Sequence, residues 1–221
     1  MNLLIKYPSR QRAEMFRKTL LGWLMKATIK GHTFVISLDA DDPQLDKYIE
    51  YIEDISLSFV EADINFHIGK SDSKIHACNR DVDQYKEWEV LLLISDDMEC
   101  VLDGWDEQIQ KDFSGNGLDS CMWYHDGSTQ RVISTLACIG RKYYDHFGYI
   151  YHPDYKSFFC DNEYTEVAKS VRKIHFTEVM LAKHQHPNWG NGKNDALYME
   201  NNKHWKHDQD LYNRRKQNGF A

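Results

Sequence analysis

Polar side chains follow three apolar stretches of the sequence, at the points where the predicted strands end. A Pro-Ser-Arg turn at 8–10 follows the first stretch, an acidic run at 39–42 follows the second, and Asp96 and Asp97 follow the third. Ligands of an open parallel sheet bind beyond the carboxyl ends of its strands, so the three clusters are expected to form one site. Adjacent carboxylates repel unless a base or a metal ion neutralises them. Asp96 and Asp97 therefore suggest a divalent cation with oxygen ligands.

Two histidines later in the chain could complete such a metal site. His184 and His186 stand two residues apart at the end of a predicted strand, where alternation places both imidazoles on one face. Neutral imidazole is a common metal ligand. A surface loop that carries two histidines before Pro187 explains the same residues, and the sequence leaves both explanations open.

Asp161 and Glu163 open a predicted helix and also have two explanations. Asp161 suits the N-cap, and Glu163 suits the first turn, where acidic residues stabilise a helix. One of the carboxylates could instead face the ligand cleft and act as a general base. Without support from other motifs, capping is a sufficient explanation.

Strands and helices alternate in the chain that must position these residues. Strands are predicted over residues 2–7, 32–38, 57–67, 89–94, 132–139 and 174–181. Helices are predicted over 12–29, 43–55, 105–113, 141–147 and 161–171, with a helix or an extended loop at 74–85. This alternation predicts an α/β fold with a mostly parallel central sheet flanked by helices. The nearly unbroken apolar strand at 89–94 is typical of a central strand buried on both faces.

The composition is that of an ordinary globular chain of 221 residues, with 42% hydrophobic residues and a formal net charge of −7. These values suit a single domain and exclude disordered, coiled-coil and collagen-like chains. No apolar stretch approaches the ~18 residues of a membrane span, and no secretion signal is evident. We therefore expect a cytoplasmic chain with no membrane insertion. The five cysteines are scattered, which predicts reduced thiols rather than a zinc site or disulfides.

Several common motifs are missing from the sequence. It contains no Gly-x-x-x-x-Gly-Lys loop, no Gly-x-Gly-x-x-Gly, no His-Glu-x-x-His and no Gly-x-Ser-x-Gly. These absences argue against P-loop NTPases, ordinary dinucleotide enzymes, zincin proteases and α/β-hydrolases. The acidic total charge also does not favour a nucleic-acid binder.

In their order and spacing, the motifs resemble those of a family 2 type glycosyltransferase of the GT-A fold, a nucleotide-diphospho-sugar transferase. The resemblance rests on Lys-Tyr-Pro-Ser-Arg-Gln-Arg at 6–12, Lys-Ile-His-Ala-Cys-Asn at 74–79 and Leu-Ile-Ser-Asp-Asp-Met at 93–98. The last segment is similar to the family's Asp-x-Asp motif, from which it departs by having two adjacent acids. The resemblance implies one GT-A domain over 1–221. Within it we expect a Rossmann-like nucleotide-binding half over about 1–98, an irregular acceptor and catalytic half over about 99–187, and a flexible C-terminal segment over about 188–221.

The resemblance also implies roles for individual residues. Asp97 would hold Mn²⁺ or Mg²⁺ together with His184 or His186, and Asp161 or Glu163 would be the catalytic base. The residues implied to bind the nucleotide sugar come from all the motifs before position 97. They are Tyr7, Pro8, Ser9, Arg10, Arg12, Asp39, Asp41, Lys74, Asn79 and Asp96.

The implied activity is that of a metal-dependent inverting glycosyltransferase. It would move a sugar from a nucleotide-diphosphate sugar, with a UDP-sugar favoured, to a hydroxyl of a glycan, protein or small-molecule acceptor. A modified nucleic-acid base is the less favoured acceptor.

Two alternative activities stay open. A nucleotidyltransferase acting on a sugar phosphate also uses paired acids and a metal ion, although no Gly-rich triphosphate loop follows the first strand. A non-catalytic carbohydrate-binding protein on the same fold could stack sugars on exposed tryptophans, for which the candidates are Trp105, Trp123, Trp189 and Trp205.

Overall fold

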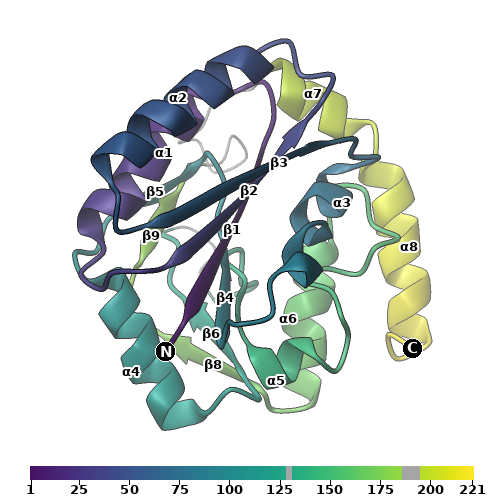
Figure 1. The fold of residues 1–221 in the computed structure, drawn as a ribbon. Coiled ribbons are helices and arrows are strands. Elements are labelled where there is room, and N and C mark those ends of the chain that lie inside the picture. The colour runs from purple at the N-terminus through teal and green to yellow at the C-terminus, as the bar shows by residue number, and fades with distance from the viewer. Residues whose placement is uncertain (128–130, 186–194) are drawn as a thin grey trace.

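A seven-stranded sheet forms the centre of the computed structural model, which describes residues 1–127, 131–185 and 195–221 (Figure 1). Its strands are β1 (Leu3–Ser9), β2 (Thr33–Asp39), β3 (Asp63–Gly69), β4 (Val90–Leu93), β6 (Cys121–Tyr124), β7 (Cys138–Gly140) and β8 (Ile174–Thr177). They lie in the order β3-β2-β1-β4-β7-β6-β8, and of these strands only β7 runs antiparallel to its neighbours. The prediction of a mostly parallel α/β sheet is confirmed.

Helices cover both faces of this sheet, as parallel strands require for their crossover connections (Figure 1). One face carries α1 (Ala13–Lys26), α2 (Leu45–Ser58) and α4 (Trp105–Asn116). The opposite face carries α3 (Lys74–Asn79), the 3₁₀ turn η1 (Val82–Gln84), α5 (Arg141–Tyr144) and α6 (Cys160–Ser170). The chain ends in α7 (Ala196–Asn202) and α8 (Trp205–Gln217), and α8 lies against the same face as α6.

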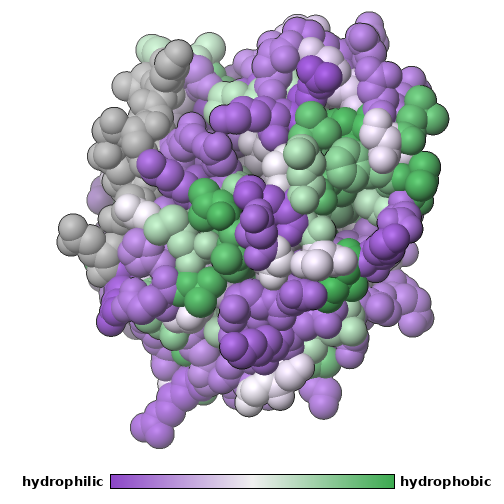
Figure 2. Space-filling view, turned by 90° about the vertical axis from the view of Figure 1, so that its left-hand side faces the viewer, coloured by the Kyte–Doolittle hydropathy of each residue, from purple (hydrophilic) through white to green (hydrophobic). Residues whose placement is uncertain are grey.

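Alternation along the strands builds a core on each face of the sheet. Leu3, Ile5 and Tyr7 of β1 pack with α1, α2 and α4, whereas Leu4 packs with the helices of the opposite face. All residues of β4 are buried, which confirms the prediction of a central strand covered on both faces. Figure 2 shows the outer side of α1 and α2 as a mostly hydrophilic surface with separate hydrophobic patches.

A second, two-stranded sheet joins the loop after β4 to the region of the late histidines. β5 (Met98–Cys100) and β9 (Ala182–His184) pair antiparallel, with Met98 opposite His184. The sequence analysis predicted neither strand, because each has only three residues. This pairing brings the chain next to Asp97 close to His184, although 86 residues separate Met98 from His184 in the sequence.

The strand predicted over 132–139 is mostly wrong, because only Cys138–Gly140 is a strand there. The preceding polar groups bond to side chains instead of a neighbouring strand. The Ser134 N–H donates to Thr165 Oγ1 at 2.9 Å, and the Thr135 hydroxyl donates to Asp126 at 2.7 Å. Val132 is exposed. Residues 134–139 are nevertheless buried, so the apolar pattern marks a buried segment of which only the end is a strand.

The C-terminal segment differs from the flexible chain expected over 188–221, because residues 195–221 contain α7 and α8. Asp195 caps α7 by accepting the Tyr198 N–H at 2.8 Å. Leu211 anchors α8 in the second core. No helix of the described part of the chain is both long and apolar enough to cross a membrane.

Candidate active site

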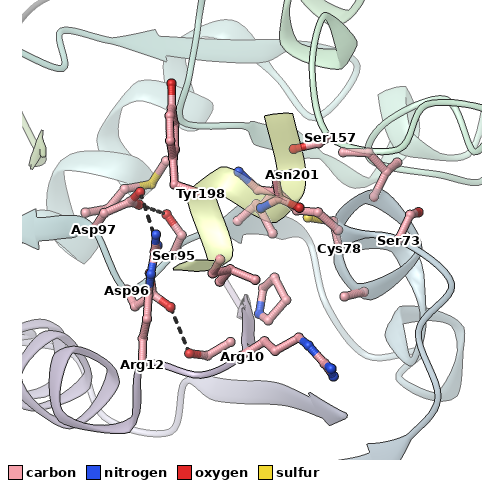
Figure 3. A pocket seen from close by; sticks show the side chains of 18 of the residues that line it. Arg10, Arg12, Ser73, Cys78, Ser95, Asp96, Asp97, Ser157, Tyr198 and Asn201 are labelled. Carbon is pink, nitrogen blue, oxygen red and sulfur yellow. Dashed lines mark hydrogen bonds and ion pairs between the residues drawn. The ribbon is translucent and has the colours of Figure 1, made fainter. Parts of the chain in front are cut away.

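A cavity of about 820 Å³ opens at the carboxyl ends of β1, β2 and β4 (Figure 3). The three polar clusters singled out in the sequence meet here, as expected for an open parallel sheet. Further wall comes from the start of α3, the start of α6, the end of β9, and α7. Among the predicted site residues, the cavity is lined by Pro8, Ser9, Arg10, Arg12, Asp39, Asp41, Lys74, Asp96, Asp97, Asp161 and His184.

Arg12 lies at the centre of the acidic groups of the cavity. Its Nη1 donates to Asp96 Oδ1 at 2.9 Å and lies 3.9 Å from Asp97 Oδ2. Its Nε and Nη2 donate to the two carboxylate oxygens of Asp195, at 2.6 and 2.9 Å. Burial and the adjacent Asp97 raise the pKa of Asp96, and they outweigh the opposing charge of Arg12. In this structure a base neutralises the paired acids, which was one of the two possibilities for them.

Asp97 and His184 form the part of the site that best suits a metal ion. Their Oδ1 and Nε2 atoms are 3.5 Å apart, and the Ser95 hydroxyl also bonds to Asp97. Although burial alone would raise the pKa of Asp97, the charges of His184 and Lys74 lower it, so the carboxylate is ionised at neutral pH. Carboxylate and imidazole are suitable donors for Mn²⁺.

Within the described residues, no group of three or more His, Cys, Asp or Glu side chains could hold a metal ion. His186, the other predicted metal ligand, lies outside the described residues. A cation at Asp97 and His184 would therefore need further oxygen ligands from a phosphate group or from water. The residues present fit a shared metal site of this kind, and they do not fit a closed structural site.

Lys74 brings a second cation into the cavity. It opens α3, whose N-cap Ser73 accepts the His76 N–H at 3.1 Å. Desolvation in the cavity opposes its positive charge, but Asp97, Cys78 and Cys160 together outweigh desolvation and raise the pKa of Lys74. Among the described residues, the ammonium has neither a hydrogen bond nor an ion pair within 4 Å. Lys74 is thus a charged group available to an anionic ligand.

Asp161 reaches the cavity from the first turn of α6. The helix begins two residues earlier than the capping explanation requires, because its N-cap is Phe159, with a left-handed φ of 61°, and not Asp161. Asp161 Oδ1 accepts the Asn162 N–H at 2.9 Å. Burial raises the pKa of Asp161 despite this bond and the nearby charge of Lys74. A half-buried carboxylate with a raised pKa that faces a cavity is suited to accept a proton.

Three predicted site residues lie outside the cavity. The Glu163 carboxylate accepts bonds from Arg215 Nε at 2.8 Å and from the Tyr155 hydroxyl at 2.8 Å, and so ties α6 to α8. Asn79 accepts the Ile150 N–H at 3.0 Å and holds the loop after α5. Tyr7 points into the first core because alternation along β1 sends it there, and its hydroxyl donates to the Phe16 carbonyl at 3.3 Å.

Other cavity residues were missed by the sequence analysis. Asp195 binds Arg12, and α7 supplies part of the wall. An aromatic wall is formed by Phe158, Phe159 and Trp205. The ring centroids of Phe158 and Phe159 lie 5.0 and 4.9 Å from that of the Trp205 indole. A signal for α7 was present, because Asp195 is a favourable N-cap residue before helix-forming side chains.

The tryptophans proposed for sugar stacking differ in exposure. Trp105 and Trp123 are buried, and only Trp205 of the described candidates is exposed, at 43%. Trp189 lies outside the described residues.

Comparisons with known proteins identify the fold. No protein-family model and no curated protein matches the sequence. A mannosyltransferase from Pyrobaculum calidifontis, solved with GDP-Man and Mn²⁺, has a TM-score of 0.69 at 10% identity over 86% of this chain. TarS from S. aureus in complex with UDP has a TM-score of 0.63 at 11% identity over 82% of this chain. The chain spans only 58% and 59% of these two proteins.

A third structure, 4-diphosphocytidyl-2C-methyl-D-erythritol synthase from Anaerococcus prevotii, has a TM-score of 0.57 at 11% identity. The match covers 93% of this chain and 96% of that protein. At such low identity these likenesses establish the fold alone. The chain has the GT-A fold of nucleotide-diphospho-sugar transferases.

Proposed function

We propose that this chain is a metal-dependent inverting glycosyltransferase, which transfers a sugar from a nucleotide-diphosphate sugar to an acceptor hydroxyl. One observation carries the proposal: a single cavity holds the Asp97–His184 pair, the Lys74 ammonium and the half-buried Asp161 carboxylate. These are the groups that a leaving diphosphate and a proton-donating acceptor require.

The donor nucleotide is assigned to the end of the cavity near β1 and β2. Arg10 bonds there to Asp39 and Asp41, at 3.0 and 2.5 Å. Asp39 Oδ1 is buried and has no hydrogen-bond donor among the described residues. A buried acceptor of this kind is costly to leave unpaired, so it favours a ligand that carries N–H or O–H donors, such as a nucleoside. A UDP-sugar is the favoured donor.

A divalent cation fits the charge of this cavity. Its wall carries more carboxylates than Lys and Arg side chains, and a diphosphate would add further negative charge. Asp97 and His184 are assigned as protein ligands of Mn²⁺ or Mg²⁺, with His186 as an additional candidate from the sequence. When bound, the ion would supply Lewis-acid stabilisation of the leaving diphosphate.

The protein groups divide the reaction between them. Asp161 accepts the proton of the acceptor hydroxyl while the oxygen of that hydroxyl forms a bond to the anomeric carbon. The bond from the anomeric carbon to the diphosphate oxygen breaks on the opposite face, so one displacement inverts the configuration. Lys74 binds the negative charge that develops on the diphosphate. The raised pKa of Asp161 makes it a stronger base than an exposed aspartate.

The acceptor is assigned to the aromatic side of the cavity. Phe158 and Phe159 immediately precede Cys160 and Asp161, and the exposed indole of Trp205 lies against both phenyl rings. Sugar rings and nucleobases both stack on such surfaces. A glycan acceptor is favoured over a modified nucleic-acid base because the chain is acidic overall.

A nucleotidyltransferase acting on a sugar phosphate is the second candidate. The observation that favours it is the near full-length match to the cytidyl-type synthase. Incubation with UDP- and GDP-sugars should release UDP or GDP in the presence of Mn²⁺. Release of pyrophosphate from UTP or CTP with a sugar phosphate, and none of the first reaction, would establish the alternative. Nucleotide binding without either turnover would indicate the non-catalytic protein.

A further inference from the structure

Arg12 is already occupied by a carboxylate from the far end of the chain. Asp195 uses both of its oxygens on the guanidinium, with N···O distances of 2.6 and 2.9 Å. The same guanidinium bonds to Asp96 at 2.9 Å. Arginine binds a carboxylate and a phosphate group with the same bidentate geometry. Asp195 therefore holds the position and the hydrogen bonds that an anionic ligand of Arg12 would use.

Lys74 and Arg12, both in the cavity, differ in whether a carboxylate is already bound to them. Lys74 lacks an ion-pair partner among the described residues, so a diphosphate can approach it directly. Arg12 has carboxylate oxygens of Asp96, Asp97 and Asp195 within 4 Å. A further anion at this position would meet repulsion from all three. Asp96 and Asp97 are fixed by the loop after β4, whereas Asp195 begins a separate helix.

α7 is packed less deeply than α8. None of its residues is buried, and the side chain of Asp195 is 36% exposed. The neighbouring α8 is anchored differently, because its buried Asp208 accepts the N–H groups of Lys156, Ser157 and Phe158. Release of Asp195 from Arg12 therefore exposes no buried residue of α7.

We infer that the Asp195 carboxylate is an internal competitor of the donor diphosphate for Arg12, and that it sets the affinity of the site for nucleoside diphosphates. The inference rests on the proposed function, which places a diphosphate in this cavity. Binding of the phosphate would exchange one bidentate partner of Arg12 for another and release Asp195. No covalent step is involved.

The test is a calorimetric titration of UDP, GDP and inorganic pyrophosphate into the full chain, with Mn²⁺ present. Asp195→Asn removes the charge but keeps a residue that caps helices well, so α7 can still form. Asp210→Asn is the matched control, because it removes an exposed carboxylate from α8, away from the cavity. We expect Asp195→Asn to bind diphosphate on the order of tenfold more tightly than the wild type. Asp210→Asn should bind like the wild type.

A second pair of variants checks that the gain passes through Arg12. In an Arg12→Gln background, the further change Asp195→Asn should no longer improve binding. Equal or weaker binding by Asp195→Asn, with clear binding by the wild type, would overturn this inference and leave the proposed function standing. An absence of binding in every variant would overturn both.

Discussion

At the scale of single residues, the structure distinguishes the surroundings of two acids, which the sequence could not do. Asp161 and Glu163 are two positions apart in the same helical turn, yet Asp161 lines the cavity and Glu163 pairs with Arg215. A helix turns by about 100° per residue, so such neighbours face different directions. Two acids that are close in the sequence can therefore differ in whether they face the cavity.

Substitutions that neutralise these two acids should have different effects on the protein. Asp161→Asn should lower the rate of sugar transfer by about 10²–10⁴-fold, with donor affinity unchanged, because it removes the proposed base. Glu163→Gln should retain the reaction but lower the free energy of unfolding by about 3 kcal/mol, because it leaves the Arg215 guanidinium without its buried partner. Steady-state kinetics and denaturant unfolding of both variants give the comparison. A reversed pattern would mean that the roles are assigned wrongly.

Burial of the Lys6 ammonium is unfavourable, and its effect should be visible in the pH dependence of the free energy of unfolding. Its ammonium bonds to the Ser37 hydroxyl, and burial lowers its pKa from 10.5 to about 7 despite the nearby Asp81 charge. Between about pH 7 and 10.5 the unfolded chain holds a proton that the folded chain has lost. The contribution of Lys6 to the free energy of unfolding therefore rises with pH through that window. Below the window, the unfavourable effect of burying the ammonium is present in full.

Lys6→Met should remove this penalty. The variant should be more stable than the wild type by a few kcal/mol near pH 6.5, since each unit of pKa shift corresponds to about 1.4 kcal/mol. The difference should shrink as the pH approaches 10. Unfolding curves at several pH values measure it, and parallel pH profiles for the two proteins would contradict the account.

At the scale of elements, the half of the chain after β4 depends on contacts that join distant segments. The pairing of β5 with β9 sets Asp97 beside His184, and α8 supports the loop that leads into α6. Asp208 is fully buried and accepts three consecutive backbone N–H groups of that loop. The loop carries Phe158 of the aromatic wall.

Asp208→Asn should loosen this loop. An amide has one acceptor oxygen, and its NH₂ group would face backbone N–H donors, so we expect a loss of about 2 kcal/mol in unfolding free energy. Faster amide exchange at residues 156–158 should accompany the loss. Asp210→Asn, on the exposed side of the same helix, should change neither quantity. Unchanged exchange in Asp208→Asn would show that α8 does not hold the loop.

At the scale of the whole molecule, the sequence predicted the sheet better than the site. Long apolar segments such as 89–94 specify parallel strands, and the polar residues that follow them meet at one edge as expected. Short strands such as β5 and β9 carry too few residues for a pattern. The helix α8 depends on tertiary partners, such as the backbone bound by Asp208, which a polar sequence does not reveal. The side of a helix that faces the cavity, as for Asp161 and Glu163, is set by the same long-range packing.

The central claim concerns a nucleotide-diphosphate site that depends on a divalent cation at Asp97. Its most direct test is calorimetric titration of UDP and GDP into the metal-stripped chain, with and without Mn²⁺, for the wild type, Asp97→Asn and the control Asp210→Asn. We predict binding of one nucleotide that requires Mn²⁺, persists in the control and weakens at least about tenfold in Asp97→Asn. Binding that is indifferent to both Mn²⁺ and Asp97, or no binding by a folded wild type, would contradict the account.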